Sequence, residues 1–146
     1  MPKSFLGISS KVSYKNWYLG FNGHANFGNY VYNNVKSKDY KTKATLGNGT
    51  YSNLLSYTAE QGFDNLQLYS DFFLEKASFF RMDNITLGHN FKNISDKFDL
   101  GVNLSVQNAF VITGYSGLDP EVYLGIDNNM YSRPRSFLFG LNVNFK

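Results

Sequence analysis

The C-terminal stretch of the chain alternates between apolar and polar residues. Its apolar positions are Phe137, Phe139, Leu141, Val143 and Phe145. The positions between them are Leu138, Gly140, Asn142 and Asn144. A period of two predicts a β-strand with one apolar face. That face fits either the core of a half-buried soluble sheet or the lipid side of an outer-membrane barrel with a polar lumen, and one strand does not separate these readings.

The same alternation recurs earlier in the chain. We predict strands near residues 4–14, 17–28, 79–91, 99–113 and 133–145. A membrane-spanning strand needs about 9–11 residues, which is close to these lengths, whereas strands of globular proteins are commonly about 5–6 residues long. The pattern predicts an all-β fold, an antiparallel up-and-down meander of about five long strands.

The segment near 79–91 changes phase once. Its apolar residues fall on even positions up to Met82 and on odd positions from Ile85. One extra residue in a strand moves every following side chain to the other face. We therefore predict a β-bulge near Asp83–Asn84.

The connections between these strands alternate in length. Lys15–Asn16 and residues 92–97 are short and polar, whereas residues 29–77 and 114–132 form long loops rich in turn-forming residues. Bacterial outer-membrane barrels combine short periplasmic turns with long extracellular loops in this way. We therefore place the two long loops outside the cell. Shorter elements within the first loop are predicted at Ser52–Gln61 or Asn65–Tyr69.

Composition also bears on whether the strands belong to a soluble sheet or to a membrane barrel. Charged residues make up 17% of the chain and aromatic residues 18%, with 14 Phe and 11 Tyr, and such aromatic richness suits the girdles of a membrane barrel. Mean hydropathy is −0.33, and no run reaches the roughly 18 apolar residues of a membrane helix. The chain has no Cys and a net charge of +3, which excludes disulfides and thiolate sites and does not favour nucleic-acid binding.

Few residues in the sequence are candidates for a catalytic or metal site. His24 and His89 fall on opposite faces by parity, so we expect a lumen residue and a girdle residue rather than a metal pair. Asp119, Glu121 and Asp127 carry oxygen ligands, but their neighbouring Pro and Asn residues favour turns. We predict no catalytic, cofactor or metal site. Two further predictions concern the outer side: a wall salt bridge between Arg81 and Asp83, and contacts to a partner or substrate by tyrosines near the strand exits. These tyrosines are Tyr30, Tyr32, Tyr115, Tyr123 and Tyr131.

Several strings resemble the C-terminal end of SusC/RagA-type TonB-dependent outer-membrane transporters. The strings are FLEKASFFRMDNITLGHNF (Phe73–Phe91), VQNAFVITGYSGLDPEV (Val106–Val122), GIDNNMYSRPRSFLFGLNVNF (Gly125–Phe145) and the opening PKSFLGISSKVSYKNWYLGFNGHANFGNYVYN (Pro2–Asn33). They follow the family's order and cover most of the chain. Departures are small: His89 replaces a typical aromatic, Ser132 a common Pro, and Lys146 follows the usual terminal aromatic.

The resemblance implies the last strands of a barrel of about 22 strands, whose plug domain and TonB-contacting segment lie outside residues 1–146. It also implies nutrient uptake, the TonB-dependent import of oligosaccharides or peptides across the outer membrane of a Bacteroidota-type Gram-negative bacterium. The implied partners are a SusD-like surface lipoprotein, TonB (through the missing N-terminal parts) and outer-membrane lipid. A fragment of this kind would not transport anything alone.

Two alternatives remain open at this point. One is a stand-alone soluble β-domain that binds carbohydrate or protein. The other is a small outer-membrane barrel of about eight strands, with further strands in residues 29–77. The opening MPKSFLGIS lacks the apolar region of a signal peptide, so we expect either a cytosolic protein or a piece of a longer one.

Overall fold

The computed structural model describes residues 2–39, 68–95, 98–128 and 131–145. Its contacts divide the chain into two compact units. We call residues 2–27, 78–113 and 133–146 the strand unit, and residues 28–77 and 114–132 the loop unit. Each unit is described by itself.

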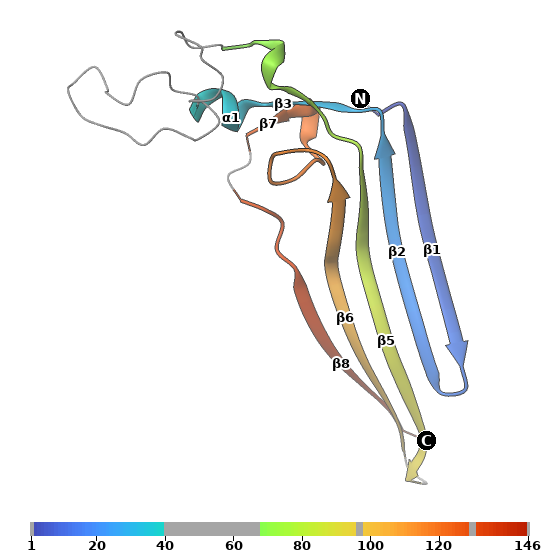
Figure 1. Cartoon of the computed structure of the whole chain (residues 1–146). Helices are drawn as coiled ribbons and strands as arrows, with labels where there is room; N and C mark the ends of the chain where they lie inside the picture. The colour runs from blue at the N-terminus through green and yellow to red at the C-terminus, as the bar shows by residue number, and fades with distance from the viewer. Residues whose placement is uncertain (1, 40–67, 96–97, 129–130, 146) are drawn as a thin grey trace, which may run out of the picture. The chain divides into compact units, whose positions relative to one another are not determined.

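The strand unit is one antiparallel sheet of long strands (Figure 1). Its strands are β1 (Ser4–Tyr14), β2 (Trp17–Phe27), β5 (Phe79–Ser95), β6 (Phe98–Thr113) and β8 (Ser136–Phe145). They lie in the order β1-β2-β5-β6-β8, and every neighbouring pair is antiparallel. The predicted all-β meander of about five long strands is confirmed.

Two strand limits differ from the prediction by more than one residue. β8 begins at Ser136 instead of residue 133, because Pro134 has no N–H to donate to a sheet ladder. The Asn108 amide instead donates hydrogen bonds to the carbonyl oxygens of Arg133 (2.8 Å) and Pro134 (3.3 Å). Residues 92–95, predicted as a connector, continue β5, since backbone pairing does not require an apolar side chain.

The predicted bulge is confirmed at Asp83. The β2–β5 register shifts between Asn22 and Gly23, and the β5–β6 register shifts between Met82 and Asn84. Asn108 adopts φ +50° on the facing strand, a left-handed conformation that Asn tolerates better than most residues. The bulge restores the apolar phase on β5, so both ends of this long strand present apolar residues to the same face.

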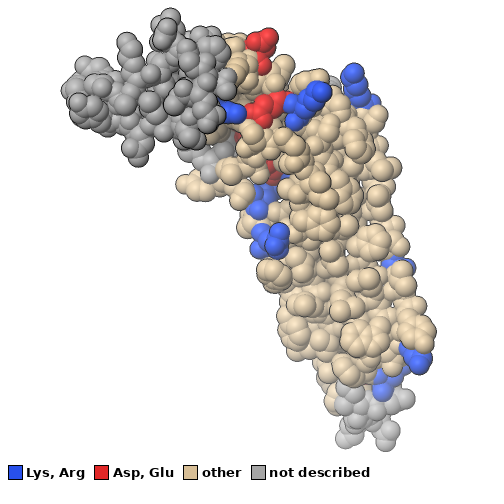
Figure 2. Space-filling model, in the orientation of Figure 1, with Lys and Arg blue, Asp and Glu red and all other residues tan. Residues whose placement is uncertain are grey.

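The register sorts the side chains into two faces. One row across the sheet consists of Val12, Leu19, Leu87, Leu104 and Phe139. The adjacent row, which faces the other way, consists of Ser13, Tyr18, Gly88, Asn103 and Gly140. All five side chains of the apolar row are exposed in the chain on its own. Figure 2 shows one side of the molecule, where the sheet surface is mostly free of charged side chains.

The loop unit contains elements that the sequence did not reveal. They are β3 (Tyr30–Asn33), α1 (Asn34–Asp39), η1 (Asp71–Phe73), β4 (Leu74–Lys76), η2 (Tyr123–Gly125) and β7 (Ile126–Asp127). β3 pairs antiparallel with β4 and parallel with β7, which gives a small sheet in the order β4-β3-β7. Its core combines residues from both long loops, Val31 and Ala77 with Tyr115 and Val122.

The predicted loops are therefore partly folded. The candidate element Ser52–Gln61 lies outside the described residues, and of Asn65–Tyr69 only the last two residues are described, as a turn. Within the described ranges, no helix is long and apolar enough to cross a membrane.

Candidate functional site

The predicted contact tyrosines fall into two groups in the loop unit. Tyr123 and Tyr131 are 87% and 88% exposed, and Tyr30 is 48% exposed. Tyr115 is only 6% exposed, and Tyr32 is half-buried. The exposed group offers apolar rings with a free edge to a partner, whereas the other two have packing roles. The contact role of all five stays a prediction.

Tyr32 ties together three parts of the loop unit. Its hydroxyl donates to the Ser37 hydroxyl of α1 (2.9 Å) and accepts from the Tyr69 N–H (2.9 Å). Its ring meets Phe73 of η1 edge to face, with ring centroids 6.3 Å apart. Both polar bonds and the ring contact would be lost if Tyr32 turned outward, so its present orientation holds α1 and η1 against β3.

Tyr115 is held by a buried carboxylate. Its hydroxyl donates to Asp127 Oδ2 at 2.8 Å, and Asp127 is 1% exposed. Burial raises the pKa of Tyr115 well above its usual value, and the negative charge of Asp127 acts in the same direction. The ring lies directly against Gly117, where a Cβ would collide with it. Asp127, predicted to form a turn, instead lies in β7 because β7 pairs with β3.

Glu75 is the centre of a polar cluster that the sequence analysis missed. It accepts hydrogen bonds from the Ser116 N–H (3.0 Å) and hydroxyl (2.7 Å) and from the Asn33 amide (3.3 Å). The Lys36 ammonium lies 3.6 Å away. Burial alone would raise the pKa of Glu75, but the hydrogen bonds from Ser116, the Lys36 charge and the Asn33 amide outweigh it and hold the pKa below its usual value.

This cluster, named here the Glu75 cluster (Asn33, Lys36, Glu75 and Ser116), joins both long loops. Glu75 is separated from Asn33 by 42 residues and from Ser116 by 41. No local spacing rule links residues so far apart, and each of them alone looks like an ordinary polar loop residue. The sequence carried no signal that could have identified the cluster.

The acidic candidates do not assemble a cation site. Asp119 Oδ1 accepts the Glu121 N–H at 2.9 Å, the turn that the sequence predicted there. Across residues 2–39, 68–95, 98–128 and 131–145, no group of three or more His, Asp and Glu side chains could hold a metal ion.

The two histidines lie on opposite faces of the strand unit, as predicted. His24 shares a row with Gly7 and Arg81, whereas His89 shares a row with Trp17 and Val102. The two rows differ in parity on β1, β2 and β6. On β5, Arg81 and His89 are both odd, but the bulge at Asp83 between them moves them to opposite faces, so the two rings point to different sides of the sheet.

His24 belongs to a polar patch beside the bulge. Its Nδ1 lies 2.8 Å from Asp83 Oδ2, and its ring meets Phe79 edge to face at 5.5 Å. Arg81 lies over the Phe79 ring and donates to Asn108 Oδ1 at 2.7 Å. The predicted ion pair of Arg81 with Asp83 stays a prediction, and His24 is the partner of Asp83 that the sequence did not suggest.

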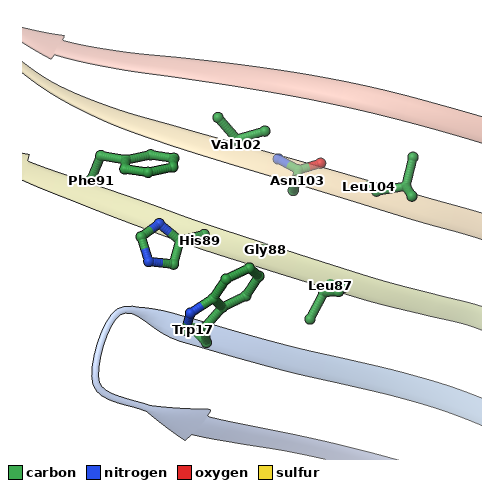
Figure 3. Close-up of a pocket in the computed structure, with 8 residues that line it drawn as sticks. All are labelled: Trp17, Leu87, Gly88, His89, Phe91, Val102, Asn103 and Leu104. Atoms are coloured by element: carbon green, nitrogen blue, oxygen red, sulfur yellow. The ribbon is translucent and has the colours of Figure 1, made fainter.

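His89 belongs to an aromatic group on the apolar face. Its ring centroid lies 4.5 Å from that of Trp17 and 4.2 Å from that of Phe91. Figure 3 shows these rings beside Leu87, Val102 and Leu104, which together line a groove of about 220 Å³. On β8 the same face carries the predicted lipid-facing residues, all exposed: Phe137, Phe139, Leu141, Val143 and Phe145.

The chain is similar to known TonB-dependent receptors. It is 40% identical over 148 residues to the TonB-dependent receptor SusC of Bacteroides thetaiotaomicron, covering 96% of this chain and 15% of SusC. It is 26% identical over 164 residues to the TonB-dependent receptor P39 of Formosa agariphila, covering 95% of this chain and 16% of that receptor. No family model matches the chain.

Solved structures share the fold. The RagAB peptide transporter aligns with a TM-score of 0.72 at 19% identity, covering 94% of this chain and 16% of that chain. The 'open-open' state of the RagAB peptide importer aligns with a TM-score of 0.74 at 20% identity, covering 98% and 17%. The alternating strands, their order and the similarity to SusC agree, and the chain spans about 15% of that receptor's length. The chain therefore belongs to the SusC/RagA-type TonB-dependent receptors.

Proposed function

We propose that this chain forms part of the barrel wall of an outer-membrane nutrient importer. The whole protein would take up oligosaccharides or peptides through a TonB-dependent mechanism in a Bacteroidota-type bacterium. The strand unit would cross the membrane, and the loop unit would lie on the extracellular side. The similarity to SusC and to the RagAB fold supports this proposal.

The observation that carries it is the apolar face. Each long strand contributes to continuous apolar rows, and residues such as Leu104 and Phe139 remain exposed at their centre. Water would disfavour so wide an apolar surface, whereas the hydrocarbon of a bilayer would solvate it. In the adjacent rows, the opposite face carries Ser, Asn and Gly, which suits the water-filled interior of a barrel.

The wall placement can be tested with a pair of neighbouring residues. Leu104→Lys puts a charge in the middle of the apolar face, and we expect a loss of about 2–4 kcal/mol of folding free energy in lipid vesicles. Ser105→Lys is the matched control, because Ser105 points to the polar face, where a lysine would stay hydrated and only the hydroxyl hydrogen bond to Thr86 (2.6 Å) is lost. Both variants belong in the receptor that carries this chain, with unfolding measured in urea. Equal losses in the two variants would contradict the proposal.

The exposed tyrosines suit contact with a SusD-like lipoprotein or a sugar ring. Tyr combines an apolar ring with a hydroxyl and loses little conformational freedom on binding. We expect Tyr123→Ala to weaken co-purification of the lipoprotein, or uptake of the nutrient, by about tenfold, which corresponds to ~1.4 kcal/mol and lies in the range of an interface hot spot, where Tyr is enriched.

Tyr14→Ala is the control for that test, because Tyr14 is equally an exposed tyrosine but lies on β1 in the strand unit. Its loss should leave both readouts unchanged. If Tyr123→Ala and Tyr131→Ala leave lipoprotein binding and uptake at the wild-type level, these residues are not the contact surface.

A further inference from the structure

The apolar face of the strand unit is not smooth but contains a groove. It is lined by the side chains of Trp17, Leu87, His89, Phe91, Val102 and Leu104 (Figure 3). They come from three adjacent strands, and Gly88 and Asn103 also line the groove. The groove has a volume of about 220 Å³ and is open to the outside, and its apolar side chains suit an acyl chain.

An imidazole ring, that of His89, stands among these apolar walls. The Nδ1 atom of His89 is buried and has no hydrogen-bond partner. A nitrogen buried in this way costs free energy, and a molecule in the groove reaches it only when the rings beside it shift. The neighbouring rings of Trp17 and Phe91 hold the imidazole in place and offer it no hydrogen-bonding group other than the indole N–H.

A fixed positive charge lies at the same end of the sheet. Tyr14 pairs with Trp17 across the β1–β2 turn, in the row that contains His89. The Lys15 ammonium lies 5.4 Å from the centre of the Tyr14 ring, so it stays on this face. A ligand in the groove would therefore meet an apolar channel, an imidazole and an ammonium in sequence.

We propose that this groove binds one anionic phospholipid, with an acyl chain along Leu87 and Leu104 and the headgroup phosphate near Lys15 and His89. The chemistry of the groove selects this occupant, because an acyl chain matches the apolar walls and a phosphate oxygen accepts hydrogen bonds from an ammonium and from an imidazole N–H. The inference rests on the proposed function, since it needs this face to lie in lipid.

The single Trp of the chain makes the proposal measurable. The receptor is reconstituted in phosphatidylcholine vesicles that contain a minor fraction of brominated lipid, either phosphatidylglycerol or phosphatidylcholine. The fluorescence difference between the wild type and Trp17→Phe isolates the quenching of Trp17. We expect brominated phosphatidylglycerol to occupy the groove about fivefold more readily, because one lysine near an anionic headgroup contributes ~1 kcal/mol.

Three variants test which side chains produce the preference for the anionic lipid. Lys15→Gln should bring the two lipids to nearly equal quenching, and His89→Phe should reduce the preference by about twofold or more through loss of one hydrogen bond. Lys11→Gln is the matched control: its ammonium also lies over a tyrosine, Tyr18 at 5.1 Å, but Lys11 belongs to the polar face. It should keep the wild-type preference.

The outcomes separate the two proposals. Equal quenching by both lipids in the wild type means that lipid reaches the face without selection, and this overturns the phospholipid site alone. Absence of quenching by either lipid means that Trp17 is not in the bilayer, and this overturns the wall placement as well. A preference that survives Lys15→Gln and His89→Phe unchanged also overturns the site.

Discussion

At the scale of single residues, Glu75 shows how one side chain can join distant loops. Its carboxylate collects three hydrogen bonds and one ion pair from Asn33, Lys36 and Ser116. Since these partners hold its pKa below the usual value of 4.5, their stabilisation is fully present above pH ~4.5 and is lost as the pH falls through the lowered pKa. The loop unit should therefore loosen only under acid conditions.

We predict that Glu75→Gln loosens the loop unit at neutral pH. Loss of the charge weakens hydrogen bonds that are worth about 1.5–3 kcal/mol each when one partner is ionised, so amide exchange around Ser116 should accelerate by about tenfold or more. Hydrogen exchange with mass spectrometry between pH 3 and pH 7 measures this. Asp71→Asn, an exposed acidic position in η1, should behave as the wild type.

A pH dependence of that exchange as large in Glu75→Gln as in the wild type would show that another group is responsible. Tyr115→Phe gives an independent check of the same unit. It removes the hydrogen bond to buried Asp127 without changing the ring, and we expect a loss of about 1–3 kcal/mol, against nearly none for exposed Tyr123→Phe.

At the scale of elements, the bulge in β5 decides which residues lie on the apolar face of the sheet. Because Asp83 is the extra residue, Phe80 and Met82 share a face with Ile85 and Leu87 despite their different parity. Gly23 lies opposite the bulge, where an added Cβ would come within 2.6 Å of the Arg81 carbonyl oxygen. Glycine is needed there because the backbones approach closely.

We predict that Gly23→Ala destabilises the sheet by about 1–3 kcal/mol, the usual cost of forcing extra atoms into a packed site. Gly7→Ala is the matched control, because a Cβ at Gly7 meets no atom within 4 Å and Ala is tolerated in an open strand position. The midpoints of urea unfolding in vesicles compare the two variants. Equal midpoints would mean that the strands can separate at the bulge without cost.

At the scale of the whole molecule, the strand count has a geometric consequence. Four successive antiparallel pairings place β1 and β8 in the same direction at opposite edges of the sheet. The two edges therefore cannot pair with each other as neighbours in an antiparallel barrel. In the proposed barrel, the N–H and C=O groups at these two edges would pair with further strands, since a bilayer supplies no hydrogen bonds.

We predict that residues 1–146 expressed alone do not form a monomeric barrel in detergent. The unpaired edges of β1 and β8 favour association of copies, so size-exclusion chromatography should give large, polydisperse species. Boiled and unboiled samples should show no heat-dependent shift of a monomer band on denaturing gels, unlike the receptor that carries this chain. A monodisperse monomer with such a shift would support the small-barrel alternative instead.

Most of the strand unit followed from the sequence because side-chain alternation is a local property. A strand turns each successive side chain to the other face, so Leu100, Val102 and Leu104 reveal both the strand and its apolar face without any partner. The same reasoning placed the bulge at Asp83 and separated His24 from His89. The start of β8 was missed by three residues because alternation does not report that Pro134 cannot pair.

The sequence by itself thus determined that the chain builds a meander with one apolar and one polar face, and its strings resembled a family to which it belongs. Only the tertiary structure decided what lies between residues far apart in the chain. The Glu75 cluster joins segments about 40 residues apart, and the groove combines Trp17 with residues of β5 and β6. Such contacts depend on which strands become neighbours, and the register of a sheet is set by pairing across strands rather than by spacing within one.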